Sequence, residues 1–214
     1  MPSREAWIER WLTHAMQAVI AAILAWGLWR GNASVIVNGV VGLGVTLLPS
    51  VLERDYEITI GPWLTFLITL GTLLHTVGMV GPYDTIWWWD NVTHTLSASI
   101  VAIGGYAITT AIDEYVEEIY LPPDFTYLFI GVTTLALGVA WEVLEFLARE
   151  LALAMGQRAV LVQYGLSDSV LDLLFDAVGA VIAALFGVPR AQSLVASIED
   201  ALEEAWGARE DRDR

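Results

Sequence analysis

The sequence contains no cysteine and no lysine. Without cysteine, disulfides, thiolate metal sites and cysteine nucleophiles are excluded, so any metal ion would be held by oxygen atoms and imidazole nitrogens. All 10 basic residues are arginine, the acidic residues number 25, and the formal net charge is therefore −15. Such an excess of negative charge argues against a nucleic acid as a partner, because the phosphate backbone would be repelled.

The acidic, lysine-free composition also points to an environment. At very high salt concentration the long-range repulsion among carboxylates is screened, and a surface rich in them is tolerated. We therefore expect a halophilic protein, whose stability depends on salt.

Charged residues are scarce as a whole. They make up 16% of the chain, hydrophobic residues make up 56%, and the mean hydropathy is +0.58. A soluble domain of 214 residues would need more polar surface than this composition supplies. The chain is expected to lie in a lipid bilayer, as a multi-pass protein of the cell (plasma) membrane.

Six apolar stretches approach the roughly 20 residues needed to cross a bilayer. They cover residues 11–29, 35–52, 61–80, 91–112, 125–147 and 169–187. The first is interpreted as a retained helix because no small-residue cleavage site follows it. The sequence predicts an all-α, polytopic membrane bundle of about six transmembrane helices in residues 1–188. Residues 189–214 are expected to form an amphipathic helix, on the membrane or against a partner, and an acidic polar tail.

An even number of spans places both termini on one side of the membrane. The membrane-flanking arginines favour that side by four to three, which weakly predicts cytoplasmic termini. Those on the side of the termini are Arg4, Arg10, Arg54 and Arg190, and those on the other side are Arg30, Arg149 and Arg158.

Ionisable residues inside the predicted spans gather near the side opposite the termini. The segment WWWDNVTH at 87–94 pairs an interfacial tryptophan cluster with an aspartate and a histidine four positions apart. A charged side chain well inside a bilayer costs about 2.5–3.5 kcal/mol, so several at one depth imply a common neutralising partner. The residues of this layer are His75, Asp90, His94, Glu142, Glu145, Asp172 and Asp176.

Spacing supports convergence within this layer. Asp90 and His94 are four residues apart, as are Asp172 and Asp176, so each pair points from one helix face. No arginine lies in the layer, so a cation fits these carboxylates best. The candidate metal ligands are Asp90, His94, Glu142, Asp172 and Asp176, and Glu145 and His75 are candidates for a catalytic base or a supporting role. A divalent ion such as magnesium, manganese, iron or zinc suits this donor set.

Four stretches of the sequence carry a resemblance to a known family. LLPSVLERDYEI at 47–58, WWWDNVTHTLSA at 87–98, WEVLEF at 141–146 and DSVLDLLFDAVGA at 168–180 resemble the YjdF-like multi-pass inner-membrane proteins, across residues 35–188. The D-x-x-x-H opening and the DLLFDAVGA stretch are more distantly similar to VanZ-like membrane proteins. The resemblance implies a multi-pass membrane fold and the same choice of residues, and it implies no particular activity.

Three functions remain open at this point. The first is a metal-dependent membrane enzyme that acts on a lipid-like or envelope substrate. The second is a proton- or cation-coupled transporter or channel, and the third is a non-catalytic scaffold with a structural cation site. A cavity open to lipid would favour an enzyme, and a continuous polar path would favour a transporter. Assembly into a homo-oligomer is left open by the sequence.

Overall fold

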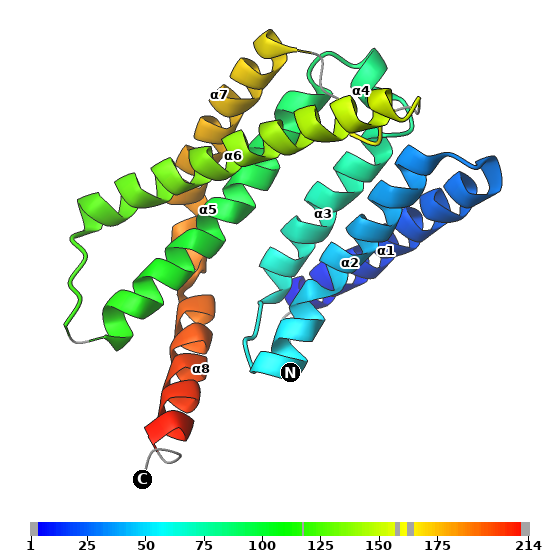
Figure 1. Cartoon of the computed structure of the whole chain (residues 1–214). Coiled ribbons are helices and arrows are strands. Elements are labelled where there is room, and N and C mark those ends of the chain that lie inside the picture. The colour runs from blue at the N-terminus through cyan, green and yellow to red at the C-terminus, as the bar shows by residue number, and fades with distance from the viewer. Residues whose placement is uncertain (1–3, 117, 157–158, 162–164, 211–214) are drawn as a thin grey trace.

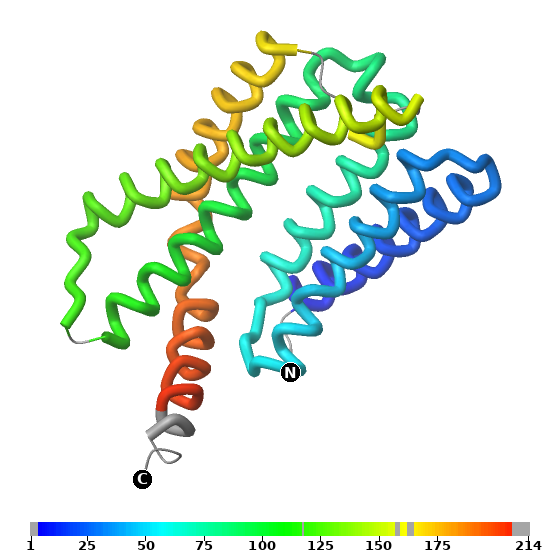
Figure 2. The backbone as a smooth tube through the Cα atoms, in the orientation of Figure 1, coloured from blue at the N-terminus to red at the C-terminus, as the bar shows by residue number. Residues whose placement is uncertain are grey.

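A computed structural model describes residues 4–116, 118–156, 159–161 and 165–210, and these residues form helices joined by short loops. Figure 1 shows the arrangement and Figure 2 traces the path of the chain. The helices are α1 (Arg4–Arg30), α2 (Ala33–Tyr56), α3 (Pro62–Gly78), α4 (Pro82–Thr85), α5 (Trp89–Tyr115), α6 (Pro123–Ala154), α7 (Leu166–Ile182), η1 (Ala183–Gly187), η2 (Val188–Arg190) and α8 (Gln192–Glu210).

Each of the six predicted apolar stretches coincides with a helix. Five helices are long and apolar enough to cross a membrane, namely α1, α2, α5, α6 and the run from α7 to η2. The sixth, α3, is apolar but has only 17 residues, which is about 25 Å at 1.5 Å per residue. The prediction of an all-α multi-pass membrane bundle is confirmed, with five long helices and a shorter one.

Turn-forming residues set the helix boundaries. The side chain of Asn32 caps α2 by accepting a hydrogen bond from the amide of Val35 at 3.2 Å. Proline opens α3, α4 and α6, at Pro62, Pro82 and Pro123, where its missing N–H would have no helical acceptor. Asn32, Pro82 and Pro123 lie between predicted apolar stretches, and Pro62 lies at the start of one.

The helices pack in two groups. Helices α1, α2 and α3 contact one another, and α5 packs against α6, α7 and α8. The groups are joined mainly where α3 contacts α5. Both ends of the chain lie at the same end of the bundle in Figure 1, opposite the loop between α3 and α5. Arg158, one of the arginines in the orientation argument, lies outside the described residues, and the orientation stays a prediction.

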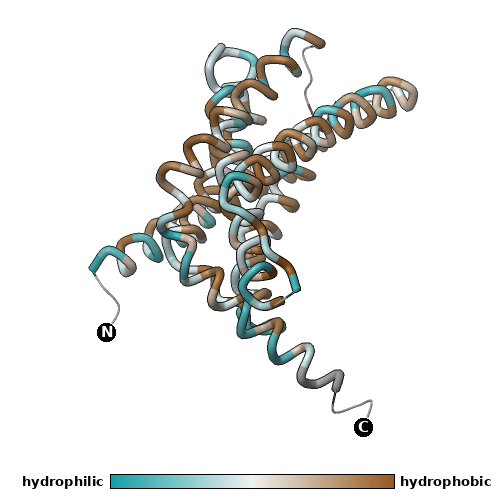
Figure 3. The backbone as a smooth tube through the Cα atoms, turned by 90° about the vertical axis from the view of Figure 1, so that its left-hand side faces the viewer, coloured by the Kyte–Doolittle hydropathy of each residue, from teal (hydrophilic) through white to brown (hydrophobic). Residues whose placement is uncertain are grey.

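Large apolar side chains cover the outside of the bundle. Along α6, Leu128, Leu144 and Leu151 are each more than half exposed, with exposed fractions of 66%, 55% and 62%. Figure 3 shows hydrophobic residues dominating the long helices, and hydrophilic residues collecting toward the two ends of the chain. A water-soluble monomer does not expose a continuous surface of this kind, so these side chains contact the lipid bilayer.

Small residues allow the closest approach between helices. A Cβ atom at Gly179 of α7 would overlap the backbone carbonyl of Thr95 in α5, and the Ser99 hydroxyl lies 2.9 Å from the Gly179 carbonyl oxygen. This contact sets the depth at which α7 meets α5. Gly44 of α2 and Gly104 of α5, by contrast, face open space.

The C-terminal helix α8 folds back on its own chain. Leu194 and Val195 are buried in the core cluster around α5, and Trp206 lies with its ring centroid 5.9 Å from that of Tyr115. The apolar face of α8 therefore packs, at least in part, against other helices of the same chain. The predicted division into residues 1–188 and 189–214 stays a prediction, and residues 211–214 of the acidic tail lie outside the described part of the chain.

Candidate metal centre

His94 stands at the centre of the ionisable layer. Its Nδ1 atom lies 3.1 Å from Asp176 Oδ1. Its Nε2 atom lies 3.7 Å from Asp90 Oδ1, 3.9 Å from Asp172 Oδ1 and 4.0 Å from Glu142 Oε1. Four carboxylates from α5, α6 and α7 thus surround one imidazole.

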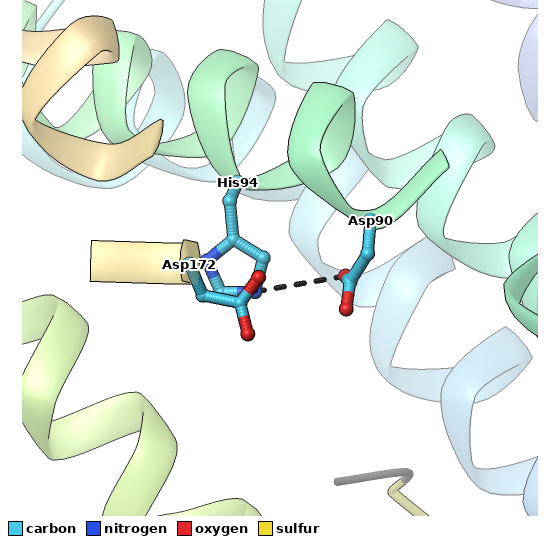
Figure 4. A group of neighbouring side chains, drawn as sticks. All are labelled: Asp90, His94 and Asp172. Carbon is cyan, nitrogen blue, oxygen red and sulfur yellow. Dashed lines mark ion pairs between the residues drawn. The ribbon is translucent and has the colours of Figure 1, made fainter. Parts of the chain in front are cut away.

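Helical spacing produces this convergence. Asp90 lies in the first turn of α5 and His94 one turn later, so both point from the same face. Asp172 and Asp176 do the same from α7, and both are buried. Figure 4 shows Asp90, His94 and Asp172 turned toward one another across the gap between α5 and α7.

A glycine of α6 makes room for Asp176. A Cβ atom at Gly138 would overlap Asp176 Oδ2 and would lie 3.1 Å from Leu173 Cδ2. The carboxylate therefore rests directly on the α6 backbone, on the side away from its hydrogen bond with His94. Only glycine at position 138 leaves this space without moving a neighbour.

The donor atoms are suited in type and spacing to a divalent cation. One ligand atom each from Asp90, His94 and Asp172 can be chosen so that all lie within 4.8 Å of one another. Carboxylate oxygens bind Mg²⁺ and Mn²⁺ at roughly 2.0–2.2 Å and Zn²⁺ over a similar range, so one ion could reach all three. Glu142 and Asp176 stand beside this group through their contacts with His94.

The negative charge of this cluster is energetically costly unless protons or a cation neutralise it. Even with a protonated His94, four ionised carboxylates would leave a charge of −3 at one depth of the membrane. Coulomb repulsion among such groups is strong where water is scarce. Bound protons or a bound cation must compensate it.

His75 sits in a second polar network next to this cluster. The Asn38 amide donates to the backbone carbonyls of Ser34 (2.9 Å) and Val160 (3.0 Å), which turns its Oδ1 atom toward His75. His75 Nε2 then donates to Asn38 Oδ1 at 2.9 Å, and His75 Nδ1 pairs with the Tyr83 hydroxyl at 2.9 Å. Both ring nitrogens of His75 are therefore engaged.

Tyr83 links this network to the acidic cluster. Its hydroxyl lies 3.3 Å from Thr93 Oγ1, and Thr93 donates to the backbone carbonyl of Asp90 at 2.8 Å. Burial raises the pKa of the Tyr83 phenol above its usual value, so the hydroxyl stays protonated. Gly78 packs against the Tyr83 ring so closely that a Cβ atom there would overlap it. The ring is held in one position.

A cavity of about 460 Å³ adjoins both networks. Helices α2, α3, α5 and α6 supply most of its lining, and the Asp176 side chain of α7 reaches it. Its polar lining includes His75, Tyr83, Asp90, His94 and Glu145. No arginine is among the lining residues in the described part of the chain. The volume lies within the usual range of small-molecule sites.

The seven predicted site residues thus fall into three positions. Asp90, His94, Glu142, Asp172 and Asp176 come together around one imidazole, Glu145 is buried and lines the cavity, and His75 is hydrogen-bonded to neutral partners. Their roles as ligands or base stay predictions. Asn38, Tyr83 and Gly138 were not among the residues predicted from the sequence. Asn38, a lone amide inside the apolar run VIVNGVV, was the signal that could have been found.

The comparisons with known proteins place the chain in a family. Residues 12–193 match the model of a family described as "Predicted membrane protein (DUF2238)". An uncharacterised protein of Thermotoga maritima is 26% identical over 133 residues, which are 61% of this chain and 65% of that relative. The match thus covers slightly less than two thirds of the relative's length. No solved structure matches the chain. The predicted resemblance to a multi-pass membrane family without an assigned activity is confirmed, and the chain belongs to the DUF2238 family of predicted membrane proteins.

Proposed function

We propose that this protein is a metal-dependent membrane enzyme that acts on a lipid-like or envelope substrate. The observation that carries the proposal is the set of four carboxylates within 4.0 Å of His94, beside a cavity whose described lining residues include no arginine. A cation turns the mutual repulsion of these groups into attraction, whereas a purely structural packing site has no reason to collect them.

Each residue has a distinct part in this proposal. Asp90, Asp172 and the Nε2 atom of His94 hold the ion, and Glu142, which lies beside the same nitrogen, is placed to be a further ligand. Asp176 fixes and polarises the His94 ring from its Nδ1 atom. When bound, a divalent ion would polarise a carbonyl or phosphoryl oxygen, or lower the pKa of a water molecule. Glu145 faces the cavity and is placed to accept a proton there.

His75 has a supporting part. Its two hydrogen bonds hold Tyr83, and Tyr83 holds Thr93 beside Asp90. With both ring nitrogens occupied by neutral partners, His75 acts by positioning the start of α5. Glu145 is the better candidate for the base.

The first experiment is metal analysis of protein purified without added metal. We expect about one divalent ion per chain in the wild type, and loss of the ion in the double variant Asp172→Ala plus Asp176→Ala. A matched control is Glu203→Ala plus Glu204→Ala, which removes two exposed acids of α8 and should leave the metal content unchanged. Absence of metal from the wild type, or equal content in the cluster variant, would remove the proposal.

The same variants separate an enzyme from a transporter. Cation flux through proteoliposomes that is lost in Asp172→Asn would favour transport, since that change removes charge with little change in shape. We expect no such flux, because the lining away from the cluster is mainly aliphatic and its polar residues, such as Thr134, carry no charge.

A further inference from the structure

The lining of the cavity changes from polar to apolar along three helices at once. On α2, Asn38 is followed two turns later by Val45, and on α5, His94 is followed by Val101. On α6, which runs in the opposite direction, Glu145 is preceded by Trp141 and Leu137. Seven or eight residues correspond to about 10–12 Å along a helix. The cavity therefore has a polar end at the acidic cluster and an apolar end about two turns deeper.

The apolar end opens sideways, toward the bilayer. Lining residues on the two flanking helices are well exposed, with exposed fractions of 59% for Val41 on α2 and 52% for Leu137 on α6. Among the described residues α2 packs mainly against α1 and α3, while α6 packs mainly against α5 and α7. The gap between α2 and α6 is the mouth. At the polar end, Trp141 meets His75 edge-on with ring centroids 6.2 Å apart, which narrows the opening there.

An apolar opening that faces the bilayer is suited to a hydrocarbon chain. The deep end offers water few polar groups, the hydroxyl of Thr134 among them, and not the set of about two to four partners that holds an ordered water molecule. Left empty, its lining would forfeit dispersion contacts. A chain from the surrounding bilayer can enter without crossing a polar surface, because it moves from one apolar environment to another.

The polar end limits the head group that can accompany the chain. Asp90, Glu145 and Asp176 line it, and no arginine is among the described lining residues. When all four carboxylates around His94 are ionised, one divalent ion still leaves them with a negative total. A phosphate or carboxylate head would meet like charge, whereas a hydroxyl, ester or amide head would not.

We propose that the cavity between α2 and α6 binds one hydrocarbon chain of an amphiphile whose head group carries no negative charge. The chain enters sideways from the bilayer, and the head lies at the Asp90–His94 cluster. The interpretation of this cavity as a substrate site rests on the proposed function. Binding of the chain itself rests on the cavity alone.

The test is photolabelling in phosphatidylcholine nanodiscs, followed by mass spectrometry of labelled peptides. The probe is a monoacylglycerol with a diazirine in the middle of its chain. A lysophosphatidic acid with the same chain serves as the anionic comparison. We expect the monoacylglycerol to label Val45, Val101 and neighbouring lining residues above the level at the exposed Leu128 and Leu151. The lysophosphatidic acid should label the lining at least about tenfold less, because like charge at the head disfavours it.

A matched pair of variants locates the label. Leu137→Trp fills the cavity, and Leu144→Trp places the same ring on an equally exposed position of α6 that does not line it. We expect cavity labelling to be lost in the first and retained in the second. Even labelling of all lipid-facing residues, or labelling unchanged by Leu137→Trp, would overturn the chain site. Equal labelling by the two probes would overturn the head-group assignment.

Chelation separates this inference from the proposed function. We expect monoacylglycerol labelling to persist in metal-free protein, because the chain is held by shape. If the wild type contains no metal and the cavity is still labelled, the enzyme proposal fails and the chain site stands. If metal is bound and the lining is not labelled, the chain site fails and the metal centre stands.

Discussion

The contact between Gly138 and Asp176 makes Gly138→Ala the sharpest test of the site geometry. The added methyl group would overlap the Asp176 carboxylate and lie 3.1 Å from Leu173. Either α6 moves away from α7, or the carboxylate turns and its 3.1 Å hydrogen bond to His94 is lost. Overpacking of a well-packed interior costs about 1–3 kcal/mol. Loss of a hydrogen bond to a charged group costs about 1.5–3 kcal/mol.

Gly131→Ala is the matched control. Gly131 lies two turns earlier on the same helix, and a Cβ atom there would have no neighbour within 4 Å. Both substitutions bring the same gain in helix propensity, so the difference between the two variants isolates the contact with Asp176. We expect Gly138→Ala to be less stable than Gly131→Ala by about 1–3 kcal/mol, or lower in Tm by very roughly 2–12 °C.

Two measurements in detergent decide the matter. Thermal unfolding followed by circular dichroism gives the difference in Tm, and titration with Mn²⁺ gives the affinity of the proposed metal centre. We expect Mn²⁺ affinity to fall about 10–100-fold in Gly138→Ala and to stay unchanged in Gly131→Ala, since Asp176 orients a ligand. Equal Tm values and equal affinities in the two variants would show that the carboxylate does not rest on α6 as described.

Three other predictions concern packing, pH and salt. Gly179→Ala should destabilise the protein by more than Gly104→Ala, because its methyl group would strike the backbone carbonyl of Thr95, whereas Gly104 faces open space; thermal unfolding compares the two variants. The pKa of Glu199 is raised from 4.5 to about 7, mainly because its side chain is hydrogen-bonded to Glu114. The docked helix α8 therefore binds a proton more readily than an undocked one, so docking is strongest below about pH 4.5 and weakens as pH rises through about 7. Hydrogen exchange in α8 should show this pH dependence, and Glu199→Gln should abolish it. Finally, the purified protein should have a higher Tm in molar salt than in low salt, and equal values would refute the halophilic interpretation.

The grouping of the ionisable residues could be predicted because it depends on spacing within single helices. Spacing of four residues placed Asp90 with His94 and Asp172 with Asp176, and the position of each pair within an apolar run fixed its depth. Once the helices pack together, inward-facing residues at the same depth come close to one another. The approach of Glu142 to His94 follows from the same reasoning.

What the sequence did not predict depends on contacts between distant segments. The partners of His75 come from α2 and from the short helix α4, and Asn38 is itself oriented by the carbonyl of Val160. No periodicity within a helix encodes such pairings. The presence of a glycine in a span does not by itself identify a close helix contact, because a Cβ atom would strike a neighbour at Gly179 but not at Gly44 or Gly104.

The division of the fold into two helix groups separates two properties of the site. The four carboxylates around His94 come from α5, α6 and α7, whereas α2 and α3 supply a wall of the cavity with Asn38, Val45 and His75. The groups meet mainly at the contact of α3 with α5, so a change in the wall need not disturb the cluster. A substitution such as Val45→Phe should therefore alter which hydrocarbon chain is accepted while metal binding is kept. Removal of an acid should have the opposite effect, because the chain is held by shape and the ion by charge.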